Sequence, residues 1–167
     1  MKTVYFGFSR PNHRMLGSEV IQKYMKTDFS HTYFKFKEEL FEDHTIFHSV
    51  GKGLSYISET NFKSHNIVVI EFALAVPDDL YIELLQDCHN NAGVKYGFLQ
   101  NIGIVLVDLL NRLGLRINKN PIDDGINCSE WIYYLLEAVF GKWVDKDPNL
   151  ITPEDAYLFL KNGINIL

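Results

Sequence analysis

Only two cysteines, Cys88 and Cys128, occur among the 167 residues of the sequence. Two cysteines cannot build a disulfide framework, and the absence of a Cys-x-x-Cys pair removes the usual sign of a structural zinc site. The sequence also has no run of lysines or arginines, and its formal net charge is −5. Its composition therefore indicates neither a nucleic-acid-binding surface nor a surface that binds anionic membranes.

Long apolar segments are missing as well. The longest apolar stretch, residues 102–115, is shorter than a membrane span and is interrupted by Asp108, Asn111 and Arg112. Residues 1–11 have neither the apolar region nor the small-residue cleavage site of a secretory signal. We therefore expect a core helix at 102–115, no integral membrane segment, and a reducing, cytoplasmic location, with export by another route left open.

The remaining composition is that of an ordinary globular chain. Hydrophobic residues make up 47% of the sequence and charged residues 22%, which is enough apolar material for a sizeable core. The length and the absence of a linker or repeat predict a single domain over residues 1–167.

Strands are expected in the first half of the chain and helices in the second. Alternating or continuous apolar residues predict strands at 3–9, 30–36, 45–50, 54–57 and 67–74, and the last of these is apolar enough to be central. Helical spacing predicts helices at 16–26, 78–90, 98–113, 129–140 and 152–163. A cluster of strands followed by a cluster of helices indicates the α+β fold class.

The motif Asn127-Cys128-Ser129-Glu130 is the strongest chemical signal in the sequence. Asn127 can serve as an N-cap, and the position of Glu130 resembles that in a capping box. Cys128 then lies in the first turn of a helix, where the helix dipole stabilises a thiolate. Backbone N–H groups of that turn can bind a developing oxyanion. The alternative is a buried structural thiol, which is our interpretation of Cys88, because Cys88 lies late in a helix.

A nucleophilic cysteine needs an imidazole base, and His31 and His48 are the best candidates among six histidines. A hairpin centred between Glu39 and Leu40 would place His31 opposite His48 on the same face of the sheet, with Tyr33 opposite Ile46. One imidazole could then act as the base while the other fixes its tautomer. A slip of one residue would separate the two histidines.

The other four histidines lie in or near turns and helix ends, and we expect them to be solvated surface residues. They are His13, His44, His65 and His89. A metal site formed by two histidines and one cysteine is an alternative for the first pair, but no carboxylate stands beside them at ligand spacing. We therefore expect no metal ion and no organic cofactor.

The ordered set of short motifs resembles a known family. Ser30-His31 comes first, His48-Ser49 follows, and Asn127-Cys128-Ser129-Glu130 opens a late helix. This order is similar to that of the circularly permuted NlpC-type, papain-like thiol hydrolases, including the YiiX-like group. The related lecithin retinol acyltransferase-like branch has the same His, His, Cys order. The resemblance covers roughly residues 3–141.

The resemblance implies a permuted papain-like fold, in which an antiparallel sheet from the N-terminal half packs against helices from the C-terminal half. It also implies Cys128 as nucleophile, His31 as base and His48 as the residue that orients the base. Tyr96 resembles the tyrosine of the family's Tyr-Asp element and is expected to bind substrate, although Gly97 stands where the family has aspartate. Glu71 is a less favoured substitute for His48.

The function expected from these residues is hydrolysis of amide bonds in peptide-like substrates, such as cell-wall peptides, through a thioester. One alternative is a lipid acyl hydrolase or acyltransferase, following the acyltransferase branch. A second alternative is a non-catalytic binding or structural module on the same fold, because a fold alone does not carry activity.

Overall fold

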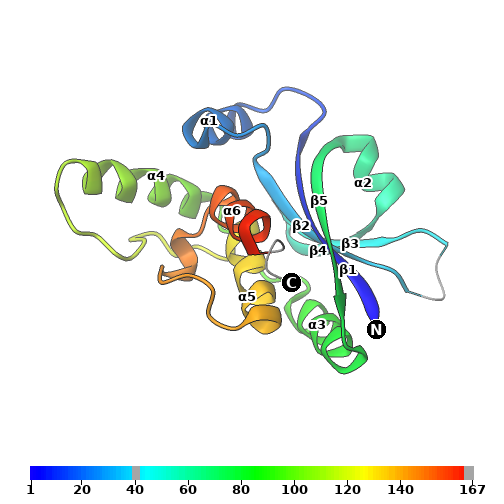
Figure 1. The fold of residues 1–167 in the computed structure, drawn as a ribbon. Coiled ribbons are helices and arrows are strands. Elements are labelled where there is room, and N and C mark those ends of the chain that lie inside the picture. Colours follow the sequence, from blue (N-terminus) through cyan, green and yellow to red (C-terminus); the bar gives the residue numbers. More distant parts are fainter. Residues whose placement is uncertain (39–41, 164–167) are drawn as a thin grey trace.

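The computed structural model describes residues 1–38 and 42–163, which form an α+β fold around a five-stranded antiparallel sheet. The strand order is β4-β3-β2-β1-β5, so β2 is central (Figure 1). All of the strands come from the first half of the chain, as expected. Their bounds are Lys2–Pro11 (β1), His31–Phe36 (β2), Thr45–Val50 (β3), Gly53–Ser58 (β4) and Asn66–Val76 (β5).

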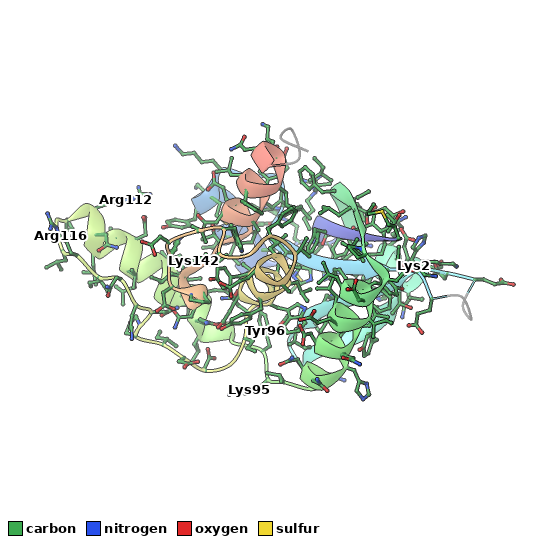
Figure 2. The ribbon with its side chains drawn as sticks, turned by 60° about the horizontal axis from the view of Figure 1, so that its bottom comes forward. Lys2, Lys95, Tyr96, Arg112, Arg116 and Lys142 are labelled. Atoms are coloured by element: carbon green, nitrogen blue, oxygen red, sulfur yellow. The ribbon has the colours of Figure 1, made fainter. Side chains whose placement is uncertain are left out.

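Six α-helices and one short 3-10 helix are found in the described residues. None of these helices has both the length and the apolar character needed to cross a bilayer. Helix α4 projects from the body of the molecule, with Arg112 and the following Arg116 at its far end (Figures 1 and 2). The bounds are Leu16–Met25 (α1), Glu59–His65 (α2), Asp78–Asn91 (α3), Phe98–Arg112 (α4), Cys128–Phe140 (α5), Pro153–Gly163 (α6) and Pro148–Leu150 (η1).

The main core lies between one face of the sheet and helices of the C-terminal half. Because side chains alternate along a strand, every second residue of β1 and β2 points to this face. Helix α5 is the most deeply buried helix and brings Trp131 against Phe47 of β3. The fully buried residues of this core include Val4, Phe6, Phe8, Phe34, Phe47, Leu54, Leu84, Leu135, Leu136, Ala156 and Leu160.

Helix α2, a seven-residue helix between β4 and β5, was not predicted. Ser58 caps it by accepting a hydrogen bond from the Asn61 amide. Its buried residue is Phe62, which packs with Tyr33 and Ile46 on the sheet face opposite the main core. A helix with a single buried side chain has too little apolar periodicity to be recognised in the sequence.

The prediction that residues 67–74 form a central strand is wrong. Among the described strands, β5 pairs with β1 alone and lies at an edge of the sheet. Ile67 and Val69 are 44% and 39% exposed, whereas Val68 packs beside the Phe62 cluster and Leu74 belongs to the main core. The apolar run in the sequence therefore reflects partial burial on both faces of β5. It does not indicate how many neighbouring strands β5 pairs with.

The predicted register between β2 and β3 is wrong by two residues. Tyr33 lies opposite His48 and Lys35 opposite Ile46. A shift of two residues preserves the face to which each side chain points, so His31 and His48 still share a face. The predicted centre of the hairpin, between Glu39 and Leu40, lies outside the described residues.

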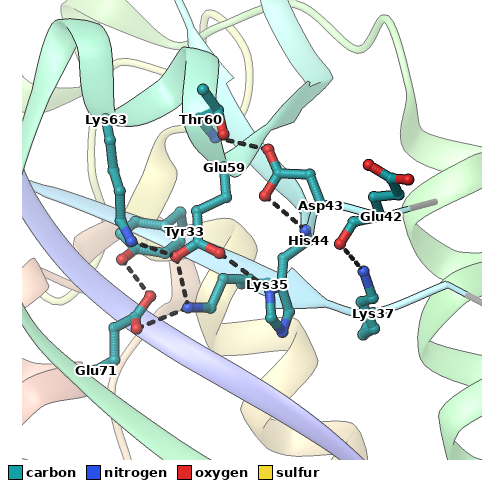
Figure 3. A network of polar contacts seen from close by, with 10 residues as sticks. All are labelled: Tyr33, Lys35, Lys37, Glu42, Asp43, His44, Glu59, Thr60, Lys63 and Glu71. Carbon is teal, nitrogen blue, oxygen red and sulfur yellow. Dashed lines mark hydrogen bonds and ion pairs between the residues drawn. The ribbon is translucent and has the colours of Figure 1, made fainter.

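A buried charge network lies beneath α2, on the same face as the two histidines (Figure 3). Lys35 is 4% exposed, and its Nζ lies 3.1 Å from a Glu59 oxygen and 2.7 Å from a Glu71 oxygen. The Tyr33 hydroxyl donates to the other Glu71 oxygen at 2.6 Å. Lys63, which is much more exposed, also pairs with Glu59 at 2.6 Å. The single buried ammonium thus neutralises two carboxylates from different elements.

Replacing Lys35 by methionine should lower the free energy of unfolding by about 3 kcal/mol, because Glu59 and Glu71 would lose their buried counter-charge. Urea denaturation measures this change. The matched control is Lys63→Met, which removes a largely exposed partner of Glu59 and should cost less than about 1 kcal/mol. Equal losses in the two variants would contradict a special role for the buried ammonium.

Candidate functional site

Asn127 caps α5 as the sequence predicts. Its Oδ1 accepts hydrogen bonds from the amides of Ser129 and Glu130, both at 2.9 Å. The Glu130 carboxylate accepts hydrogen bonds from Gln100 at 2.7 Å and Tyr134 at 3.3 Å. Burial raises its pKa, and the backbone amide of Asn127 is among the groups that oppose this shift, as the reciprocal contact of a capping box would.

This cap leaves the amide of Cys128 available. Cys128 is the first residue of α5, and Asn127 occupies the amides of the next two residues. The Trp131 amide bonds the Asn127 carbonyl at 3.1 Å. Within the described part of the chain, no hydrogen bond occupies the Cys128 N–H. The positive end of the helix therefore offers one free donor, on the residue that carries the thiol.

The Cys128 thiol is enclosed, with 4% of the residue exposed. Burial raises the pKa of the thiol, and polar groups of Thr32 and Ser129 only partly oppose this effect. The Ser129 hydroxyl lies 4.0 Å from the sulfur. Because Thr32 directly follows His31 at the start of β2, the sulfur lies against the strand that carries the predicted base.

The end of the sheet is open at this point. The β2–β3 ladder stops at the pair Tyr33 and His48, so Thr32 of β2 and Ser49 of β3 are not paired with each other. The Ser49 hydroxyl donates to the carbonyl of Ile126 at 3.2 Å, which ties the segment before α5 to the end of β3. The start of α5 is thereby held where β2 begins and β3 ends.

The two predicted imidazoles lie side by side. Nε2 of His31 and Nδ1 of His48 are 3.2 Å apart, and the ring centroids are separated by 5.4 Å. Phe62 of α2 packs against both rings. A hydrogen bond between two imidazole nitrogens requires one of them to carry the proton, so this contact couples the tautomers of the two rings.

Both imidazoles are neutral at pH 7. Burial lowers the pKa of His31 to about 4. Burial, and then repulsion from a charged His31, lowers the pKa of His48 to about 3. With a thiol pKa that is also raised, the resting pair is a thiol and a neutral imidazole. It is not the thiolate–imidazolium pair expected from the motif.

The structure places the predicted nucleophile and base on opposite faces of the sheet. Thr32, which Cys128 contacts, shares the main-core face with Phe34, whereas His31 points to the α2 face with Tyr33. Over residues 1–38 and 42–163, the sulfur of Cys128 is hydrogen-bonded to neither His31 nor His48. The His31 ring instead faces His48 and Phe62, on the α2 side of the sheet. Proton transfer from the sulfur would require the His31 side chain to leave His48 and Phe62 and to pass around the start of β2 to the core face of the sheet.

Tyr96 belongs to the same region. Residue 96 forms a parallel bridge with Ile126, two positions before the cysteine. Burial raises the pKa of the Tyr96 phenol, and the nearby charge of an ionised Cys128 raises it further, while the Asn101 amide donates to the phenol oxygen at 3.1 Å. Position 97 requires glycine, because its backbone lies close to that of Gly125. A Cβ on residue 97 would lie 2.9 Å from the Gly125 carbonyl oxygen. An aspartate, as in the family motif, would not fit.

Sequence reasoning missed several residues that build the site. Thr32 and Ser49 are not predicted as part of the site, because nothing in their local sequence shows that the segment at the start of α5 contacts them. Asp124 caps α4 from a distant position in the chain, since its carboxylate accepts hydrogen bonds from the amides of Leu99 and Gln100 at 3.1 and 3.0 Å. An acidic residue far along the chain gives no local sign that it caps another helix.

Other candidates lie elsewhere. Cys88 is 0% exposed in α3, and burial raises its pKa. The Glu71 carboxylate is held by Tyr33 and Lys35 and is not bonded to either histidine of the pair. The expectation that His44 is a solvated residue is wrong, because it is half-buried and its Nδ1 lies 3.0 Å from Glu59. The remaining three histidines are exposed: His13, His65 and His89.

One group of described residues has the spacing of metal ligands. Potential ligand atoms of Asp43, His44 and Glu59 lie within 4.8 Å of one another. Glu59 already pairs with two lysines, Lys35 and Lys63. Asp43 accepts hydrogen bonds from backbone amides of its own neighbourhood. A divalent cation would therefore compete with ammonium groups that are in place, and we assign no metal to this group.

The lowered pKa of His48 makes stability depend on pH. Between pH 6.5 and about 3 the unfolded chain binds a proton at this residue that the folded chain does not, so stability falls as the pH drops below 6.5. His48→Gln removes this titration and should reduce the loss between pH 7 and 5 by on the order of 2 kcal/mol in urea denaturation. The matched control is His89→Gln, which replaces an exposed histidine of α3. An unaltered slope in His48→Gln would contradict the buried, neutral assignment.

No family model matches the sequence, and no curated protein matches it significantly. The function is therefore inferred from the residues and from their arrangement in the structure.

Proposed function

We propose that this protein is a cysteine hydrolase of the permuted papain-like kind, which cleaves amide bonds of small peptide-like substrates through a thioester. One observation carries the proposal. The Cys128 thiol, at the start of α5, lies against Thr32, the residue next to His31, and the His31 imidazole is hydrogen-bonded to His48. All three residues thus lie at the same end of the sheet, Cys128 beside its core face and the two histidines on its α2 face, in the chain order of the family.

The hydrogen bond between the imidazoles supports definite roles. If Nε2 of His31 carries the proton and donates it to Nδ1 of His48, then Nδ1 of His31 is left unprotonated and able to act as a base. His48 then holds the productive tautomer and stabilises the imidazolium that forms on His31 during reaction. The low pKa values keep both rings neutral, so His31 is ready to accept a proton at pH 7.

The reaction follows from these roles. Nδ1 of His31 takes the Sγ proton as the sulfur attacks the substrate carbonyl carbon, and the free amide of Cys128 donates to the oxyanion. His31 returns the proton to the leaving amine as the carbon–nitrogen bond breaks. Water, deprotonated by His31, then releases the acid from the thioester and restores the thiol. Tyr96, close to the sulfur, is placed to contact the substrate.

The enclosed thiol favours a second candidate, a non-catalytic module on this fold. Cys128 is 4% exposed and its pKa is raised, as for a structural cysteine. Catalysis requires the substrate to displace side chains around the sulfur and His31 to pass to the core face of the sheet. The two candidates therefore differ in whether Cys128 reacts with an acyl donor faster than a buried thiol does.

Incubation with an activated acyl ester, followed by intact-protein mass spectrometry, tests the proposal. The wild type should form a thioester on Cys128. His31→Ala should acylate roughly 10²–10⁴-fold more slowly, because it lacks the base. Cys128→Ser should carry no thioester, and the matched control Cys88→Ser should behave as the wild type.

Acylation of Cys128 that is unaffected by His31→Ala, or no faster than that of Cys88, would contradict the hydrolase and favour the non-catalytic module. The substrate class is decided by comparing release of peptide from cell-wall fragments with release of fatty acid from lipid micelles. Turnover of the lipid alone would replace the amidase by the acyl hydrolase.

A further inference from the structure

Helix α4 is apolar on two separate sides. One side is buried and includes Ile104 and Val107, which pack against Leu150 of η1. The other side is exposed and consists of five large aliphatic residues at helical spacing. These are Leu99 (49% exposed), Ile102 (54%), Leu106 (41%), Leu109 (53%) and Leu113 (73%).

The five exposed residues form a single stripe. Their spacings of three and four positions confine them to about a quarter of the helix circumference. A surface helix that buries one apolar face normally presents polar residues on the opposite face. A second apolar stripe along the whole helix therefore indicates contact with something beyond this chain.

Cations gather at the end of this stripe. Arg112, Arg116 and Lys119 are all exposed, and Figure 2 shows Arg112 and Arg116 at the projecting tip of the molecule. Asp108, which pairs with Arg112 at 2.7 Å, is the one acidic residue of α4. Exposed Leu115 lies in the same tip, at 53%. The tip is thus apolar and locally positive, although the net charge of the whole chain is −5.

We propose that the exposed stripe of α4 and its basic tip, together the α4 surface, dock on an anionic lipid bilayer. An interfacial helix combines large aliphatic residues on one side with basic residues that reach the lipid phosphates, and the α4 surface has both. The tip projects from the body of the molecule (Figure 1). The charge of the tip complements anionic headgroups.

The α4 surface also has a defined relation to the candidate site. The stripe starts at Leu99, and the first turn of α4 holds Tyr96 through the hydrogen bond from Asn101. Docking along the stripe would hold the Cys128 region beside the headgroups. The inference does not depend on the hydrolase proposal, because binding to lipid is measured without any turnover.

Flotation of the full chain with lipid vesicles tests the inference. Vesicles of phosphatidylcholine with phosphatidylserine should bind the wild type at least roughly tenfold more strongly than phosphatidylcholine alone, and high salt should weaken that binding. The double variant L109E/L113E should lose most of the binding. Arg116→Glu should weaken binding to the anionic vesicles more than to the neutral ones.

The matched control is Leu158→Glu, which changes an aliphatic residue of α6 that is 44% exposed and lies outside the α4 surface. It should bind vesicles as the wild type does, and circular dichroism checks that every variant is folded. Equal binding by L109E/L113E and the wild type overturns the inference, as does absence of vesicle binding. A dimer in solution that L109E/L113E converts to monomer would also overturn it, by identifying a second copy of the chain as the occupant.

Discussion

The attachment of the start of α5 to the open end of the sheet is the contact on which the rest of the site depends. The β2–β3 ladder stops before Thr32 and Ser49. Thr32 contacts Cys128, and Ser49 contacts Ile126 in the segment before α5. Asn127 fixes the helix start by binding two amides.

The same enclosure that positions the thiol also sets its resting chemistry. Burial favours the uncharged form of every titratable group, so it raises the pKa of Cys128 and lowers the pKa of His31 and His48. These shifts oppose a thiolate–imidazolium pair in the resting protein. The site therefore differs from one in which the cysteine is already ionised before a substrate binds. A nucleophile in such a setting must be activated after the substrate arrives, when the carbonyl and the leaving group replace the present neighbours of the sulfur.

The local parts of this arrangement were predictable from the sequence, and the long-range parts were not. The N-cap by Asn127 depends on residues that are adjacent in the chain, and it was predicted correctly. The side-by-side imidazoles were predicted from an incorrect register, because a two-residue shift preserves the face. The edge position of β5 and the capping of α4 by Asp124 depend on distant segments, and the pattern of a single element carries no information about them.

On the α2 side, the two histidines have no carboxylate partner among the described residues. Lys35, Glu59 and Glu71 form a charge network that satisfies its own members, and Phe62 packs against both imidazoles. With no buried anion bonded to them, the imidazoles have nothing to stabilise a proton until a negative charge develops nearby. In the proposed reaction that charge is the thiolate of Cys128, so the proposal requires His31 to reach the core face before the sulfur ionises. Burial alone keeps both groups in their uncharged forms.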